Sequence, residues 1–265
     1  MSFIIKDLSY IHTDKEILFS HLHLSINSGD KIALTGNNGC GKSTLMRILA
    51  GDLSPSSGTV LRPEHLYYVP QHFGQYDRQT IAQALGISHK LSALHAILSG
   101  DATEKHFNTL NDDWNVEERA QASLDSWGLD GITLSRPMEG LSGGEKTRIF
   151  LAGMELHNPT AILLDEPTSF LDIKGKIELL TILGTLAHTQ KLAVILSLHE
   201  LELAEKIADT VVCVSPGGVS GVLTPEQAFQ PENIRALYGL TEQQYTALFG
   251  TPEPEAEKAP AGKPP

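Results

Sequence analysis

The sequence is poor in cysteine and in long apolar runs, and each shortage excludes a class of protein. Its two cysteines, Cys40 and Cys213, are too few for a disulfide framework and fit a reducing compartment. The longest apolar runs, such as residues 192–198, are far shorter than the ~20 residues that a helix needs to cross a bilayer, and the first residues lack the basic start of a secretory signal. We therefore expect a cytoplasmic protein with no direct membrane insertion.

Positive charge is also scarce, because 20 Lys and Arg face 32 Asp and Glu, a formal net charge of −12. This balance argues against a broad nucleic-acid-binding face, since phosphate backbones are gripped by clustered cations. What is present is apolar material for a core: 41% of the 265 residues are hydrophobic. Residues 251–265 are rich in proline, alanine and charge, so we expect a disordered tail there.

Short apolar segments alternate with helical stretches, the pattern of an α/β fold with a mostly parallel sheet. Between residues 71 and 141 the sequence is polar and rich in helix formers, which indicates a helical insertion. We expect one domain over residues 1–250, with a helical subdomain at about 75–140 inserted into it. The expected strands cover residues 3–10, 31–35, 66–69, 161–164, 193–198 and 210–214.

A glycine-rich loop follows the expected strand at residues 31–35 and precedes an expected helix at 43–50. Its sequence matches the phosphate-binding pattern G-x-x-x-x-G-K-[ST] in the context that the pattern requires. Backbone N–H groups and the helix N-terminus would hold phosphates, Lys42 would reach the β and γ phosphates of a nucleotide, and the Ser43 hydroxyl would bind Mg²⁺. The loop consists of Gly36, Asn37, Asn38, Gly39, Cys40, Gly41, Lys42, Ser43 and Thr44.

Two further strands are expected to end in catalytic groups, because a parallel sheet presents its ligand-binding residues at the carboxyl ends of its strands. The strand at 161–164 runs into Asp165 and Glu166. Asp165 would face Mg²⁺ through water, and Glu166 would orient or deprotonate the water that attacks the γ-phosphate. The strand at 193–198 is followed by His199, which would contact the γ-phosphate.

Residues Leu141, Ser142, Gly143, Gly144 and Glu145 open an expected helix with an S-x-x-E capping box. Placed after the phosphate loop and before the acidic strand, this segment resembles the signature motif of ATP-binding cassette (ABC) proteins. A P-loop kinase would share the phosphate loop but has no reason to contain this segment.

The resemblance covers nearly residues 3–250 and implies the P-loop NTPase fold of an ABC nucleotide-binding domain, with a small antiparallel β part beside the mostly parallel core sheet. It also implies further roles. Gln71 matches the glutamine of the Q-loop, a catalytic and metal-binding position, and residues 169–172 match the D-loop. In that family the signature of one domain lies across from the phosphate loop of another, so Ser142 and Gly144 would contact ATP held by a partner. The resemblance thus implies a homodimer or a pairing with a second ABC domain. Either Tyr10 or His12 would stack on adenine, and we favour Tyr10.

Different parts of the chain resemble two different branches of the family. Residues 3–168 resemble the ABC-F branch, which acts on the ribosome, whereas residues 169–250 resemble the ATPase subunit of iron, siderophore and cobalamin importers. Such a junction suits a shuffled or engineered gene or a natural subfamily. With one cassette, no long charged linker and an acidic balance, we favour an importer subunit bound to a membrane permease, at the inner face of the membrane, over a ribosome-acting ABC-F protein.

Overall fold

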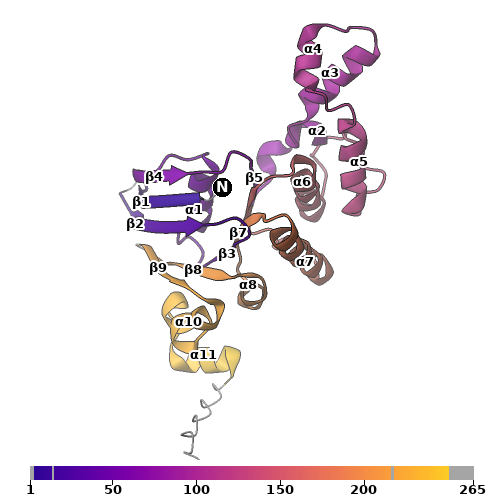
Figure 1. The fold of residues 1–265 in the computed structure, drawn as a ribbon. Coiled ribbons are helices and arrows are strands. Elements are labelled where there is room, and N and C mark those ends of the chain that lie inside the picture. The colour runs from indigo at the N-terminus through magenta and orange to yellow at the C-terminus, as the bar shows by residue number, and fades with distance from the viewer. Residues whose placement is uncertain (1–2, 14, 216–217, 251–265) are drawn as a thin grey trace, which may run out of the picture.

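The computed structural model describes residues 3–13, 15–215 and 218–250, so the expected tail at 251–265 lies outside the described residues. The chain forms two sheets and a set of helices (Figure 1). The larger sheet has six strands in the order β5-β6-β7-β3-β8-β9, and only the pairing of β8 with β9 is antiparallel. The predicted α/β fold with a mostly parallel sheet is therefore confirmed.

The central strands of this sheet are buried on both faces, which explains why their sequences are continuous apolar runs. All five residues of β6 and all five of β7 are buried. Each of these strands ends at the edge where the phosphate loop begins. The six strands are β3 (Lys31–Thr35), β5 (Leu66–Val69), β6 (Ala161–Asp165), β7 (Ala193–Ser197), β8 (Thr210–Ser215) and β9 (Gly218–Leu223).

The smaller sheet is antiparallel, in the order β2-β1-β4, which confirms the small antiparallel β part that the family resemblance implied. It consists of β1 (Phe3–Ile11), β2 (Ile17–Ile26) and β4 (Ser57–Leu61). Of these, the sequence patterns predicted only β1, because β4 is mostly exposed and β2 interrupts its apolar alternation with exposed polar residues.

Two apolar clusters lie on opposite faces of the six-stranded sheet. One joins alternate strand residues such as Ile32, Leu34 and Ile195 to α1 and the antiparallel sheet. The other joins the intervening residues, such as Val194 and Leu196, to α6 and α7. This alternation follows from the two-residue period of a strand and fixes the register of the sheet.

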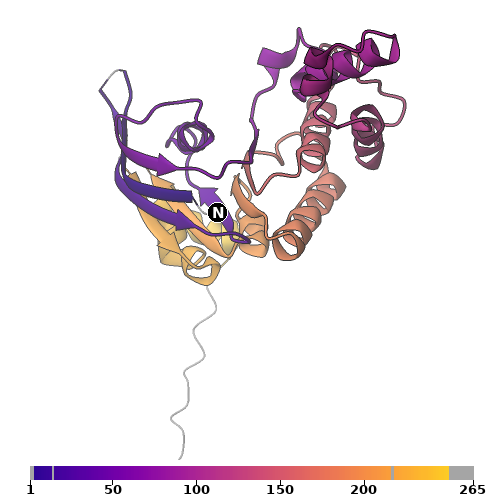
Figure 2. The same cartoon turned by 45° about the horizontal axis from the view of Figure 1, so that its top comes forward.

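Helices cover the sheet and extend from it. The segment between β5 and α6 carries α2 to α5, and Figures 1 and 2 show α3 and α4 at the end of the molecule remote from the antiparallel sheet. Within the described residues, none of the helices is long and apolar enough to span a membrane. The helices are α1 (Lys42–Ala50), a 3₁₀ turn (Gly74–Tyr76), α2 (Ile81–Ala84), α3 (Ser88–Leu98), α4 (Glu104–Leu110), α5 (Val116–Ser126), α6 (Gly143–His157), α7 (Ile173–Thr189), α8 (Leu201–Ile207), α9 (Pro225–Ala228), α10 (Pro231–Tyr238) and α11 (Glu242–Phe249).

Candidate active site

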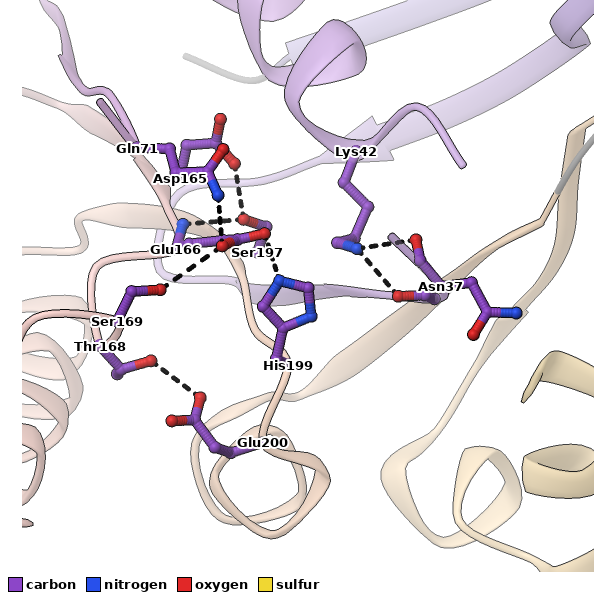
Figure 3. A network of polar contacts seen from close by, with 11 residues as sticks. Asn37, Lys42, Gln71, Asp165, Glu166, Thr168, Ser169, Ser197, His199 and Glu200 are labelled. Carbon is purple, nitrogen blue, oxygen red and sulfur yellow. Dashed lines mark hydrogen bonds and ion pairs between the residues drawn. The ribbon is translucent and has the colours of Figure 1, made fainter. Parts of the chain in front are cut away.

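The phosphate loop joins the end of β3 to the first turn of α1. Gly36 cannot be replaced without a shift, because a Cβ there would lie 2.0 Å from the carbonyl oxygen of Val214. Gly41 caps α1 with φ 105°, a conformation that favours glycine. Lys42 is only 4% exposed, and its ammonium group donates to the carbonyl oxygens of Gly36 at 2.8 Å and Asn37 at 3.1 Å. The lysine is thus folded back over the loop that would hold phosphate (Figure 3).

Asp165 and Ser197 lie side by side because β6 and β7 pair in parallel register at these residues. Ser197 Oγ donates to Asp165 Oδ1 at 2.7 Å and accepts from the backbone N–H of Glu166 at 2.9 Å. Burial raises the pKa of the Asp165 carboxyl, and hydrogen bonds from Ser197 and Ser43 oppose this rise. The site therefore holds a buried carboxylate beside a hydroxyl of the phosphate loop.

Glu166 follows in a left-handed backbone conformation, with φ 50°, which is uncommon for a residue other than glycine. Its carboxylate is contacted from three sides (Figure 3). Gln71 Nε2 donates to Oε2 at 2.5 Å, Ser169 Oγ lies 3.4 Å from the same oxygen, and His199 Nε2 is in hydrogen-bond contact with Oε1. Gln71, Glu166 and His199, predicted from three separate segments, thus meet at one point.

These groups surround an open cavity of about 380 Å³ at the carboxyl edge of the sheet. The arrangement brings a cation, backbone N–H groups and a carboxylate around one volume, which suits an anionic ligand that reacts with water. The lining residues are Asn38, Gly39, Gly41, Lys42, Ser43, Thr44, Gln71, Glu166 and His199.

Three residues of the predicted phosphate loop, Gly36, Asn37 and Cys40, are not among the residues that line this cavity. Gly36 and Cys40 are buried, and burial raises the pKa of the Cys40 thiol, so Cys40 packs beneath the loop. The Asn37 side chain donates to the carbonyl oxygen of Leu237 in α10 at 3.4 Å.

Oxygen donors for a hard divalent cation gather at one side of the cavity. The Ser43 hydroxyl and the buried Asp165 carboxylate are hydrogen-bonded, and the Gln71 amide lies close by through Glu166. Hydroxyl, amide and carboxylate oxygens fit Mg²⁺, which keeps several waters and takes few protein ligands. Within the described part of the chain, no group of three or more His, Cys, Asp or Glu side chains is arranged to hold a metal ion.

Ser142 and Gly144 lie elsewhere, beside a separate groove of about 840 Å³ whose lining includes Phe170 and Lys174. Ser142 forms the predicted capping box with Glu145: Ser142 Oγ accepts from the Glu145 N–H, and the Glu145 carboxylate accepts from the Ser142 N–H at 2.7 Å. The pKa of Glu145 is held below its usual range, chiefly by the hydrogen bond from the Ser142 backbone N–H and then by the hydrogen bond with the Ser142 side chain. The two predicted nucleotide-contacting motifs therefore line two separate cavities of the chain.

Tyr10 and His12, the two residues predicted as candidates to stack on adenine, lie at the end of β1 and directly after it. Tyr10 is half-buried, with its ring 6.1 Å from that of Phe19, whereas His12 is exposed. Sequence reasoning assigned no role to Ser197, although it bridges Asp165 and Glu166. Its place is apparent only once β6 and β7 are known to be neighbours.

Comparisons with known proteins agree on one family. A family model described as "ABC transporter" matches residues 19–169. The chain is 35% identical over 233 residues to the energy-coupling factor transporter ATP-binding protein EcfA2 of Methanospirillum hungatei, covering 87% of this chain and 57% of that protein. It is 32% identical over 250 residues to the petrobactin import ATP-binding protein FpuD of Bacillus anthracis, covering 92% and 89% of the two chains.

A solved structure of a metal-chelate type ABC transporter in an inward-facing conformation is also similar, with a TM-score of 0.69 and 26% identity over 90% of this chain and 89% of that chain. The chain spans 57% to 62% of the length of the first three curated relatives that it matches. A match over 87% of the chain necessarily crosses residue 168, so residues on both sides of it are similar to this relative.

Proposed function

The chain belongs to the ABC transporter family of ATP-binding domains, and from this membership we propose that it binds and hydrolyses ATP as the energising subunit of an importer. The observation that carries the proposal is the meeting of Lys42, Glu166 and His199 around one cavity. A phosphate loop alone would support binding, but a base and a histidine opposite it support hydrolysis.

We infer that Mg²⁺ is bound with ATP. Ser43 and Asp165, with Gln71, would hold the ion, which would neutralise charge on the β and γ phosphates. The buried Asp165 carboxylate and its hydrogen bonds to Ser43 and Ser197 support this assignment.

In the reaction, the Glu166 carboxylate orients a water molecule and accepts its proton as the water oxygen attacks the γ-phosphorus and the bond to the ADP oxygen breaks. His199, in contact with Glu166 Oε1, fixes the carboxylate and the γ-phosphate relative to each other. Lys42, released from the carbonyl oxygens of Gly36 and Asn37, stabilises the charge on the transferred group. Typical general-base assistance of this kind is worth roughly 10²–10⁴ in rate.

The partner needed for turnover is a second ABC domain, either another copy of this chain or a related cassette. Ser142 and Gly144 line a groove distinct from the phosphate cavity, so each chain would supply its signature to ATP bound by the other. Closure around two ATP molecules would be the working step. Loss of the γ-phosphate would remove the affinity for the closed state and let the pair open.

The importer function is favoured over the ABC-F alternative. FpuD, which is named as a petrobactin import protein, matches along 92% of this chain and 89% of its own length. We accordingly propose a membrane permease as partner, with the chain held at the cytoplasmic face of the membrane through that permease.

The experiment is to express the Glu166→Gln variant in bacterial cells and fractionate the lysate with ATP and Mg²⁺. We expect the variant to accumulate with membranes, bound to a protein with several membrane spans. The matched control is the same variant carrying Lys42→Ala, which should be retained less because its ATP binding is weakened. Sedimentation with ribosomes instead would overturn the importer assignment and support ABC-F.

A further inference from the structure

The loops that follow β6 and β7 are joined at a second point, beyond the contact between His199 and Glu166. Thr168 Oγ1 donates to Glu200 Oε2 at 2.9 Å, and the Lys176 ammonium group of α7 donates to Glu200 Oε1 at 2.5 Å. Glu200 directly follows His199, and Thr168 lies two residues beyond Glu166. Figure 3 shows the contact between His199 and Glu166 and the contact between Thr168 and Glu200 as two connections between the same two loops.

The Glu200 carboxylate is well held. Burial on its own would raise its pKa, but the hydrogen bonds from Lys176 and Thr168 outweigh burial and keep the pKa of Glu200 below its usual range. Each carboxylate oxygen has one of these partners, and Thr168 is only 1% exposed. Hydrogen bonds to an ionised acceptor are the stronger kind. The contact therefore joins a carboxylate that is 36% exposed to a buried hydroxyl and to the Lys176 ammonium group.

Glu200 also begins the next helix. It occupies the N-cap position of α8, where its carbonyl oxygen accepts from the N–H groups of Leu203 and Ala204, each at 3.1 Å. His199 consequently lies in a short segment between the end of β7 and Glu200. Glu200 is in turn joined to α8 by its backbone and to the loop after β6 by Thr168. His199 itself is 37% exposed, which means that packing alone does not fix its ring.

We propose that Glu200 is a positioning residue for hydrolysis: its contacts with Thr168 and Lys176 hold His199 in place against Glu166. His199 lines the cavity that would hold the nucleotide. Glu200, the next residue, is not among the described residues that line this cavity. The effect on turnover rests on the proposed function, whereas the position of the His199 ring is a property of the chain itself.

The contact has a second consequence, because Lys176 lies on α7. The first turns of this helix line the groove that also contains Ser142 and Gly144. Glu200 thus connects the loop that carries His199 to α7, whose first turns line the groove that would face the partner domain.

The first test is steady-state ATPase activity of a matched series. Glu200→Ala removes both contacts, Thr168→Val removes the hydroxyl with little change of shape, and Thr168→Ser restores it. Glu202→Gln, at an exposed position on α8, is the control. We expect kcat to fall about tenfold in the first two variants, with the KM for ATP changed less than about twofold, because misplaced groups slow the chemical step without weakening binding. An unchanged kcat, or a raised KM alone, would overturn the proposal.

The second test does not depend on activity. The imidazole nitrogen signals of His199 are recorded by NMR and identified by their absence in His199→Asn. We expect Glu200→Ala and Thr168→Val to move these signals toward those of a solvated histidine, while Glu202→Gln leaves them in place. Unmoved signals would refute the positioning role. If the unsubstituted chain hydrolyses no ATP, the proposed function fails, and the NMR series still decides the role of Glu200.

Discussion

Ser197 Oγ donates a hydrogen bond of 2.7 Å to Asp165 Oδ1 in a region where both residues are almost fully buried. Even with this bond, burial keeps the pKa of Asp165 above its ordinary value of 3.8. A buried carboxylate that resists ionisation lowers the stability of the nucleotide-free protein. We interpret it as a cation ligand whose charge is balanced only when Mg²⁺ and ATP are bound.

Asp165→Asn should therefore stabilise the nucleotide-free protein. Because the folded state binds this proton more tightly than the unfolded chain does, the contribution of Asp165 to stability falls as the pH rises above 3.8, and the variant lacks this loss. We expect the urea midpoint of the variant to exceed that of the native protein at pH 7 and to approach it near pH 4. Its Mg²⁺-dependent ATPase activity should fall by about 100-fold. A variant that is less stable than the native protein at pH 7 would contradict this account of Asp165.

Lys42→Ala should weaken ATP binding itself. The buried ammonium group is held by two carbonyl oxygens of the loop and would turn to the phosphates when ATP binds. Loss of hydrogen bonds to charged groups, at about 1.5–3 kcal/mol, corresponds to roughly 10- to 100-fold weaker binding. Titration calorimetry with ATP and Mg²⁺ measures this directly. Lys105→Ala, on exposed α4, is the control and should bind as the native chain does; equal affinity in both variants would refute the role of Lys42.

Gly144→Ala should slow hydrolysis and spare ATP binding by the single chain. A Cβ at Gly144 would lie 2.9 Å from the carbonyl oxygen of Phe170, so the start of α6 has to shift. Since Ser142 and Gly144 would act on the partner's nucleotide, we expect at least about a tenfold loss of kcat with unchanged ATP affinity.

The matched control for this change is Gly184→Ala, in the middle of α7. There the added Cβ would make only an ordinary contact, 3.8 Å from Ile207 Cδ1, and alanine favours the helix by up to about 1 kcal/mol. Activity should be retained and the melting temperature should not fall. If Gly144→Ala weakened ATP binding as much as it slowed turnover, the division of the site between two chains would be wrong.

The sequence predicted the buried strands well because they are apolar throughout. The limits of β3 and β5 agree with the expected residues, and β6 differs only by including Asp165. By contrast, β2 and β4 escaped prediction, since their exposed residues break the apolar patterns on which such predictions rest.

The site was predictable where chemistry lies in a local motif, as in the phosphate loop and at Glu166. The contacts between loops were not. Ser197 contacts Asp165 and Glu200 contacts Thr168, each pair 32 positions apart in the sequence, and only the order of the strands brings them together. The separation of Ser142 from the phosphate cavity likewise followed from resemblance and not from any pattern in the sequence.

The most direct test of the central claim is the Glu166→Gln variant, measured for ATP hydrolysis, ATP affinity and association state. Glutamine keeps the size of the side chain and removes its ability to accept a proton. We expect turnover to fall by about 100-fold or more while ATP affinity is kept and ATP-bound dimers accumulate in sedimentation velocity. Turnover equal to that of the native chain would contradict the assignment of Glu166 as the base.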